Sequence, residues 1–174
     1  CLVALVDLAG ERLEHAASNC ARSVPFAADL TVLDALPALV EKIQGELGAV
    51  DVLVNNAGVL SNAKSAATDE AEWRRVLSIN LDAAFFLARA VIPSMMSRRW
   101  GRIINTTSLA AKTGGLTAGT AYAVSKGAMS ALTFSLAREL AGVGITVNGV
   151  APAYVRTPMV TEQLTEPQRR HILA

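Results

Sequence analysis

The sequence predicts an α/β fold in which a doubly wound parallel sheet carries helices on both faces. Short apolar runs typical of buried strands alternate with longer stretches of helical periodicity, and polar or turn-forming residues close most of these runs. Hydrophobic residues make up 52% of the chain and charged residues 18%, which excludes a disordered composition. Because 174 residues suit one core, we expect residues 1–174 to form a single domain.

The first half of the chain contains two predicted strands and an amphipathic helix. Residues 2–6 (LVALV) form an apolar run closed by Asp7, as in a buried strand. Between residues 32 and 47, leucine, valine and isoleucine recur at three- and four-residue steps, which predicts a helix that ends at Gly48. Residues 50–54 form the next strand, which runs directly into a turn of small and polar residues, NNAG.

The second half continues the alternation of strands and helices. Residues 69–99 predict a long helical stretch that has to bend, or end and restart, at Pro93. A strand over residues 102–108 precedes a loop rich in Gly, Thr and Ala. A helix from about 120 to 142 then leads into the last strand, residues 145–150.

The predicted strands place several polar residues at one rim. In a doubly wound sheet, ligands bind outside the carboxyl ends of the strands, where the loops diverge and helix amino termini point outward. Asp7, the NNAG turn at 55–58, Ser108 and the loop after Val150 all follow predicted strands. We therefore expect them to share one ligand site.

Composition excludes several classes of partner. Lys and Arg total 16 against 15 Asp and Glu, so no global field attracts nucleic acid, and no apolar stretch reaches the roughly 20 residues of a membrane span. Cys1 and Cys20 have no Cys or His at metal-ligand spacing, and His15 and His171 are isolated. We expect a cytoplasmic protein that acts on a small molecule without a metal site.

Tyr122 and Lys126 lie four positions apart, so on the predicted helix they occupy adjacent turns of one face. A free tyrosine titrates near pKa ~10 and is a poor base at neutral pH unless a nearby cation stabilises its phenolate. With Lys126 as that cation, the phenol can exchange a proton with a substrate oxygen held by the hydroxyl of Ser108. Taken alone, this spacing also fits a surface pair.

Further segments accompany this pair in a set order. They are NNAG (55–58), SINL (78–81), GRIIN through Ser108 (101–108), AYAVSK (121–126), ITVN (145–148), and Pro152 with TPM (157–159). Together they resemble the classical short-chain dehydrogenase/reductase family over nearly the whole chain. The resemblance implies a Rossmann-like fold with Tyr122 as catalytic acid/base, assisted by Lys126 and Ser108. It also implies that Asn80 completes the catalytic group from a distorted helix; an amide satisfied by backbone groups is the alternative.

The same resemblance implies a set of cofactor contacts. Asp7 is similar to an acidic residue that binds both hydroxyls of the adenine-side ribose, and because a carboxylate repels a ribose phosphate, NAD(H) is favoured over NADP(H). The alternative role of Asp7 is to cap the following helix. Asp29 would contact the adenine amino group, with Leu30 packing nearby. The other implied cofactor-binding residues are Asn56, Ala57, Gly58, Tyr122, Lys126, Pro152, Val155 and Thr157.

Two features depart from the family pattern. The sequence lacks the glycine-rich turn TGxxxGxG and the family's final elements, so we expect a domain truncated at both ends, whose sheet lacks a central strand. Ala153 stands where the family usually has glycine, which predicts strain if the backbone there needs a positive φ.

The sequence-based hypothesis is an oxidoreductase that transfers hydride between NAD(H) and a secondary alcohol or ketone. The alternatives are an NADPH-dependent 3-oxoacyl carrier-protein reductase, which shares every motif, and a catalytically silent binding or scaffold protein. The resemblance further implies a homotetramer, or a homodimer, built on the long central helix and the Tyr122 helix. The candidate contact residues are Phe85, Phe86, Ala131 and Phe134; packing within the core is the competing account.

Overall fold

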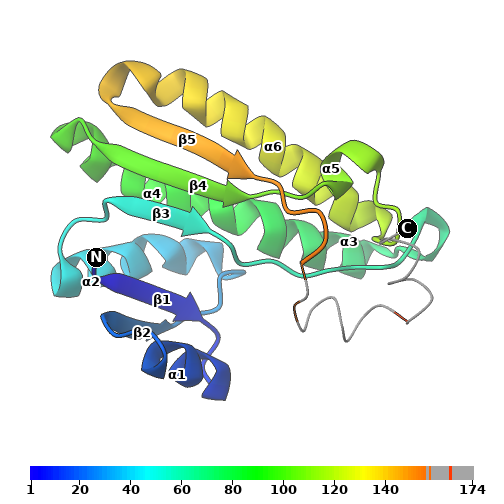
Figure 1. Ribbon diagram of the computed structural model, residues 1–174, viewed down its shortest axis with the longest axis horizontal. Coiled ribbons are helices and arrows are strands. Elements are labelled where there is room, and N and C mark those ends of the chain that lie inside the picture. The colour runs from blue at the N-terminus through cyan, green and yellow to red at the C-terminus, as the bar shows by residue number, and fades with distance from the viewer. Residues whose placement is uncertain (156, 158–164, 166–174) are drawn as a thin grey trace.

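The computed structural model describes residues 1–155, 157 and 165, and within this part the strands form two separate parallel sheets (Figure 1). Strand β1 (Val3–Asp7) pairs with β2 (Ser23–Ala27). Strand β4 (Gly101–Thr106) lies between β3 (Val52–Asn55) and β5 (Ile145–Val150) and pairs with both. The carboxyl ends of β3, β4 and β5 therefore lie at one edge of the three-stranded sheet.

Helices connect the strands in chain order. They are α1 (Glu11–Ser18), α2 (Leu36–Leu47), α3 (Glu70–Leu77), α4 (Ala83–Arg98), α5 (Ala110–Thr113) and α6 (Thr120–Leu140). A π-helical turn, Ser78–Asp82, joins α3 to α4, and single 3-10 turns occupy Leu33–Ala35, Ser65–Ala67 and Ala141–Val143.

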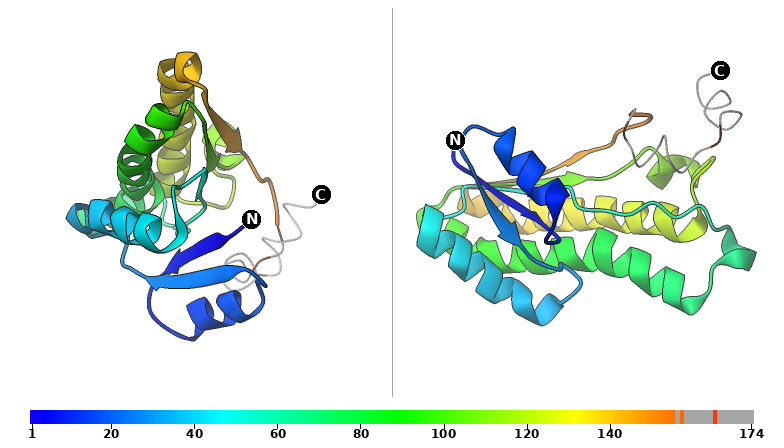
Figure 2. Two further views of the ribbon diagram at one scale, coloured as in Figure 1. Left: turned by 90° about the vertical axis from the view of Figure 1, so that its left-hand side faces the viewer. Right: turned by 90° about the horizontal axis from the view of Figure 1, so that it is seen from below.

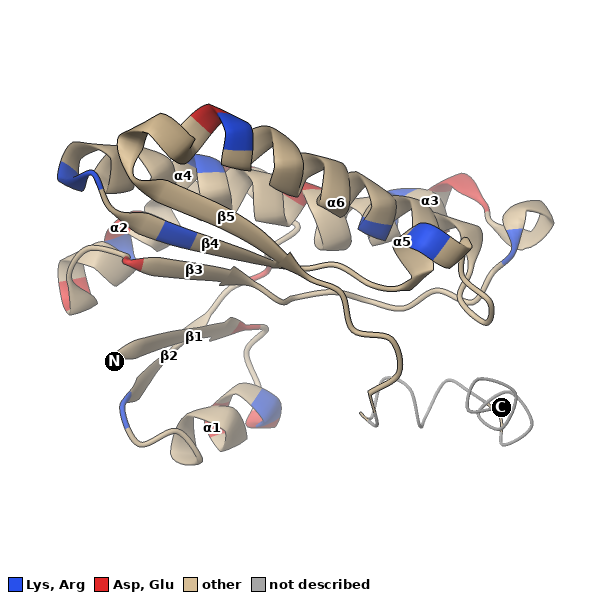
Figure 3. Ribbon diagram, turned by 45° about the horizontal axis from the view of Figure 1, so that its top comes forward, with Lys and Arg blue, Asp and Glu red and all other residues tan. Residues whose placement is uncertain are grey.

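The helices form layers on the two sides of the strands. Helices α4 and α6 lie side by side against one face of the three-stranded sheet, and α2 extends that layer beside α4 (Figures 1 and 2). Helix α1 packs on β1 and β2 from the side opposite α2 (Figure 2). Figure 3 shows acidic and basic residues interspersed over the helices rather than segregated by sign. The predicted arrangement of helices on both sides is confirmed.

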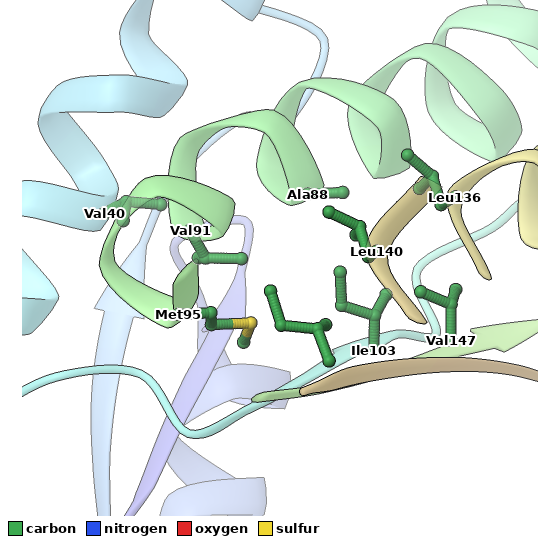
Figure 4. Packing of buried hydrophobic residues seen from close by; sticks show 9 residues of the cluster. Val40, Ala88, Val91, Met95, Ile103, Leu136, Leu140 and Val147 are labelled. Atoms are coloured by element: carbon green, nitrogen blue, oxygen red, sulfur yellow. The ribbon is translucent and has the colours of Figure 1, made fainter. Parts of the chain in front are cut away.

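The hydrophobic core lies between this helical layer and the three-stranded sheet (Figure 4). Met95 of α4 and Ile103 of β4 have no exposed surface, and Leu140 of α6 and Ile145 of β5 are nearly as buried. Removing such side chains from water supplies the main favourable free energy of folding. The core therefore fixes α6, the helix that carries Tyr122, against β4 and β5.

Most predicted elements form where the sequence places them, with differences that have physical causes. Strand β2 was not predicted because Pro25 interrupts its apolar run; the structure accommodates Pro25 since β2 pairs only with β1 within the described residues and thus lies at a sheet edge. The long helix is irregular at Ser78–Asp82, while α4 continues through Pro93. The loop expected after β4 contains the short helix α5.

The single sheet expected from the alternation is divided in two. Strands β1 and β3 each have one partner, and no strand of the described part lies between them to bridge the sheets.

The continuous helical run Glu70–Arg98 contains an 18-residue window with a mean hydropathy of 1.5, which is long and apolar enough to meet a composition criterion for a membrane span. Length and composition alone are weak evidence. Ala88, Val91 and Met95 of this run pack in the hydrophobic core, and 33% of the apolar window is buried inside the structure.

Candidate active site

Lys126 joins helix α6 to the carboxyl end of β4. Its Nζ donates a hydrogen bond to the carbonyl oxygen of Thr106 over 2.7 Å, and only 3% of the residue is exposed. Tyr122, one turn earlier, is half-buried, and the lysine Nζ lies 5.9 Å from the centre of its ring. The predicted pairing of phenol and ammonium on one helix face is therefore present in the fold.

Burial lowers the pKa of Lys126 from its ordinary value of 10.5 to about 8. An ammonium has three N–H donors, and in the described part of the chain Lys126 has one hydrogen-bond acceptor, the Thr106 carbonyl. The remaining donors match hydroxyl acceptors. This donor set fits the ribose of a nicotinamide nucleotide.

Asn80 is held in the π-helical turn and is fully buried. Its side-chain oxygen accepts from the backbone N–H of Val59 over 2.8 Å, and its amide donates to the Val59 carbonyl and to the Ser125 hydroxyl, each over 3.0 Å. The Ser125 hydroxyl in turn donates to the Tyr122 carbonyl over 2.8 Å. Asn80 thus ties the segment after NNAG to the Tyr122 helix; its side chain bonds backbone groups, as the alternative supposed, but in a distorted helix.

Gly58 lies directly beside the side chains of Asn80 and Lys126. A Cβ at this position would lie 3.2 Å from Asn80 Oδ1 and 3.5 Å from Lys126 Nζ. An added methyl group would press on the asparagine oxygen, which would have to shift by a few tenths of an ångström, and would lie in ordinary contact with the lysine. The NNAG turn approaches Asn80 and Lys126 this closely because glycine has no side chain.

Ser108 lies two residues beyond β4, on the same strand exit as the Thr106 carbonyl. Its hydroxyl accepts from the Ala110 N–H over 3.1 Å at the start of α5. The neighbouring Leu109 N–H donates to the carbonyl of Pro152 over 3.0 Å. The loop after β5 is thereby bonded to the residue that follows the serine, as expected for residues of one rim.

Asp7 and Asp29 lie together at the carboxyl edge of the two-stranded sheet. Asp7 is exposed and its carboxylate accepts from the Leu8 N–H over 2.7 Å; helix α1 begins after Gly10 with no side-chain cap, so Asp7 does not cap it. The Ala28 N–H donates to the Asp7 carbonyl over 2.9 Å. Hydrogen bonds from the Thr31 hydroxyl and backbone lower the pKa of Asp29, whose carboxylate is therefore already engaged in a turn.

The remaining predicted residues differ in how firmly they join the site. Asn56 accepts from the Thr106 hydroxyl over 3.3 Å, whereas Ala57 and Val155 are exposed. Leu30 is half-buried beside Asp29, and Thr157 is described without its neighbours, residues 156 and 158–164. Ala153 does not adopt a positive φ, so the strain considered for this alanine does not arise. Residues 158, 159 and 171 lie outside the described part.

Two contributors to the site were not predicted. The Ser125 hydroxyl bridges Asn80 and Tyr122, and the Thr106 carbonyl holds Lys126. Helical spacing alone could have identified Ser125, because it follows Tyr122 by three residues on one helix. The Thr106 carbonyl carries no sequence signal, since every residue has one.

The fold is that of an α/β protein with a tyrosine–lysine helix at the carboxyl edge of a parallel sheet. A family model described as short chain dehydrogenase matches residues 1–168. The chain belongs to this family, whose members are oxidoreductases that use nicotinamide nucleotides, and both the predicted family and the predicted fold are confirmed.

Named relatives agree with this membership. Nodulation protein G of Rhizobium sp. (strain N33) is 40% identical over 98% of this chain and 71% of its own length, and 3-oxoacyl-acyl-carrier-protein reductase FabG of Thermotoga maritima is 38% identical over 86% and 60%. The crystal structure of NAD+-bound xylitol dehydrogenase superposes with a TM-score of 0.81 at 35% identity, covering 87% of this chain and 60% of that one. The chain spans between 53% and 71% of the two nodulation proteins that it resembles.

Proposed function

We propose that the protein is an oxidoreductase that transfers hydride between NAD(H) and a secondary alcohol or ketone. The observation that carries the proposal is the buried Lys126 ammonium, fixed by the Thr106 carbonyl beside Tyr122 and Asn80. A buried cation beside a phenol is the arrangement that makes tyrosine a useful acid/base near neutral pH. A structural ion pair does not account for it, because no carboxylate of the described residues pairs with Lys126.

In this mechanism Tyr122 transfers the proton, while Lys126, Ser108 and Asn80 stabilise and position the reacting groups. Tyr122 accepts the proton of a substrate alcohol, or donates one to a carbonyl, and the Lys126 cation stabilises the phenolate. Ser108 hydrogen-bonds the substrate oxygen, and Asn80 fixes the turn after NNAG against α6. A bound nicotinamide would supply the hydride acceptor or donor. The nicotinamide nucleotide would be held by Lys126, Asn56, Ala57, Gly58, Pro152, Val155 and Thr157.

Asp7 supports NAD(H) as the cofactor. Its exposed carboxylate at the end of β1 offers an acceptor for ribose hydroxyls and would repel a ribose phosphate. Asp29 and Leu30 would line the adenine. The structural relative xylitol dehydrogenase is titled as NAD+-bound.

A second candidate function is an NADPH-dependent 3-oxoacyl carrier-protein reductase. The observation that favours it is the 38% identity to the Thermotoga maritima reductase over 86% of this chain. The exposed Asp7 opposes it, because a phosphorylated ribose would meet a carboxylate there. A catalytically silent scaffold is disfavoured by the intact Lys126, Asn80 and Gly58 arrangement.

We further propose a cytoplasmic homotetramer, or a homodimer, of single-domain subunits. Phe134 on α6 is 77% exposed and Phe85 on α4 is 41% exposed, and Ala131 is exposed beside them on α6. Exposed aromatic side chains on adjacent helices favour association between subunits, because an interface would remove their apolar surface from contact with water.

The experiment that tests this function is a titration and activity assay on the complete purified protein. NADH and NADPH are titrated separately and followed by fluorescence, and a panel of secondary alcohols, ketones and 3-oxoacyl thioesters is then assayed with each nucleotide. We expect tighter NADH binding and turnover of an alcohol or ketone. Tighter NADPH binding with selective thioester turnover would favour the second candidate, and binding without turnover would favour the scaffold.

A further inference from the structure

The amino-terminal end of α6 is docked on the segment that follows the NNAG turn. The Gly119 N–H donates to the Ser61 carbonyl over 2.6 Å, and the Thr120 N–H donates to the Ala63 carbonyl over 3.1 Å. These are orphan donors of the first helical turn, which a cap normally satisfies. No side chain caps α6 at its N-cap position, Gly119, so residues 61–63 take over that role.

Lys64 completes this junction from the other direction. Its Nζ donates to the Ala118 carbonyl over 2.6 Å and to the Gly115 carbonyl over 3.0 Å. Both acceptors belong to the loop that leads from α5 into α6. The lysine thus holds the incoming loop while residues 61–63 hold the first turn of the helix.

The contact is too close to tolerate side chains. A Cβ on Gly119 would collide with the backbone of Ala63 and Ser61, and Gly115 has a φ of +78°. Only glycine adopts that conformation without strain and permits such close backbone approach. The two glycines therefore allow the loop to dock this closely, and the Lys64 ammonium reaches two of its carbonyl oxygens.

Helix stability does not explain the position of Lys64. The amino-terminal end of a helix carries a positive partial charge, which disfavours a nearby cation. Two carbonyl acceptors offset this repulsion only while the loop stays docked. The Lys64 ammonium thus stabilises the docked conformation of the loop.

We propose that Lys64 is a positioning residue for the reaction, because it fixes the loop and first turn that carry Tyr122 relative to Ser108. Tyr122 lies in the first turn of α6, and Ser108 lies just before α5. The loop that Lys64 holds by hydrogen bonds therefore lies between these two residues. A shift of this loop moves the phenol away from the substrate oxygen. The inference rests on the proposed function, since it concerns the geometry of that reaction.

The test compares three variants of the complete protein. Lys64→Met keeps most of the side-chain length and loses the donors, and Lys64→Arg keeps the donors. Lys64 and Lys112 are both exposed, so Lys112→Met, on α5, is the matched control. We expect Lys64→Met to lower kcat about tenfold or more, since small misplacements of catalytic groups are costly. KM for the nucleotide should change less than about twofold, because the cofactor contacts remain. Arginine should restore most of the loss, and the control should match the wild type.

Hydrogen–deuterium exchange of peptides covering residues 115–123 gives a readout that does not depend on turnover. Lys64→Met should speed exchange of the Gly119 and Thr120 amides, and Lys64→Arg should not. Unaltered kcat or unaltered exchange in Lys64→Met, or an arginine variant as impaired as the methionine variant, would overturn the positioning role. A wild type that binds no nucleotide and turns over nothing would instead overturn the proposed function, and this role with it.

Discussion

Replacing Lys126 by methionine should change the pH dependence of stability by an amount that follows from its burial. The pKa of Lys126 falls from 10.5 to about 8 on folding, so the unfolded chain binds the proton more tightly than the folded one. A lowered lysine pKa destabilises the folded state below pH 8, and this penalty disappears as the pH rises from 8 to about 10.5. At about 1.4 kcal/mol per pKa unit, the full penalty is roughly 3 kcal/mol.

The assay is urea unfolding of Lys126→Met and the wild type at pH 7 and pH 10, without nucleotide. The variant lacks the penalty at pH 7 but also lacks the charged hydrogen bond to Thr106, so its absolute stability there should stay close to that of the wild type. Between pH 7 and pH 10 the wild type should gain roughly 2.5 kcal/mol relative to the variant, because most of the penalty is relieved in that interval. Lys112→Met is the control, since this lysine is exposed. A stability difference that does not vary with pH would refute the burial argument.

Three further changes test the fold, the site and the assembly. Ser125→Ala leaves the buried Asn80 amide without its serine acceptor, so unfolding in urea should show a loss of about 1–3 kcal/mol together with a lower kcat; unchanged values would remove Ser125 from the site. Ile103→Ala empties a fully buried position and should cost about 2–5 kcal/mol, whereas Val52→Ala at a 46% exposed position should stay within about 0.5 kcal/mol. Phe134→Glu should lower the molar mass measured by light scattering, and an unchanged oligomer would argue against this contact surface.

Local patterns in the sequence were sufficient for the helices and strands that form the site. The four-residue spacing predicted that Tyr122 and Lys126 share a helix face, and the structure places the ammonium 5.9 Å from the ring. Strand β5 begins and ends where its apolar run does. These features follow from backbone periodicity, which depends on residues near in sequence.

Tertiary features were not accessible in this way. The Lys126 bond to the Thr106 carbonyl and the Lys64 bonds to the 115–118 loop join residues far apart in sequence through backbone acceptors that no residue type identifies. Strand β2 was missed because Pro25 is tolerated only at an edge, and edges are known only once the strands are ordered. The sequence could propose residues for the site, but the contacts that fix its geometry required the fold.

Steady-state and single-turnover kinetics of Tyr122→Phe in the complete protein test the catalytic role of the phenol most directly. This change removes one hydroxyl and keeps the ring, so NADH affinity measured by fluorescence should stay within about twofold of the wild type while turnover falls at least about a hundredfold. Turnover comparable to the wild type, with nucleotide binding retained, would contradict the assignment of proton transfer to Tyr122.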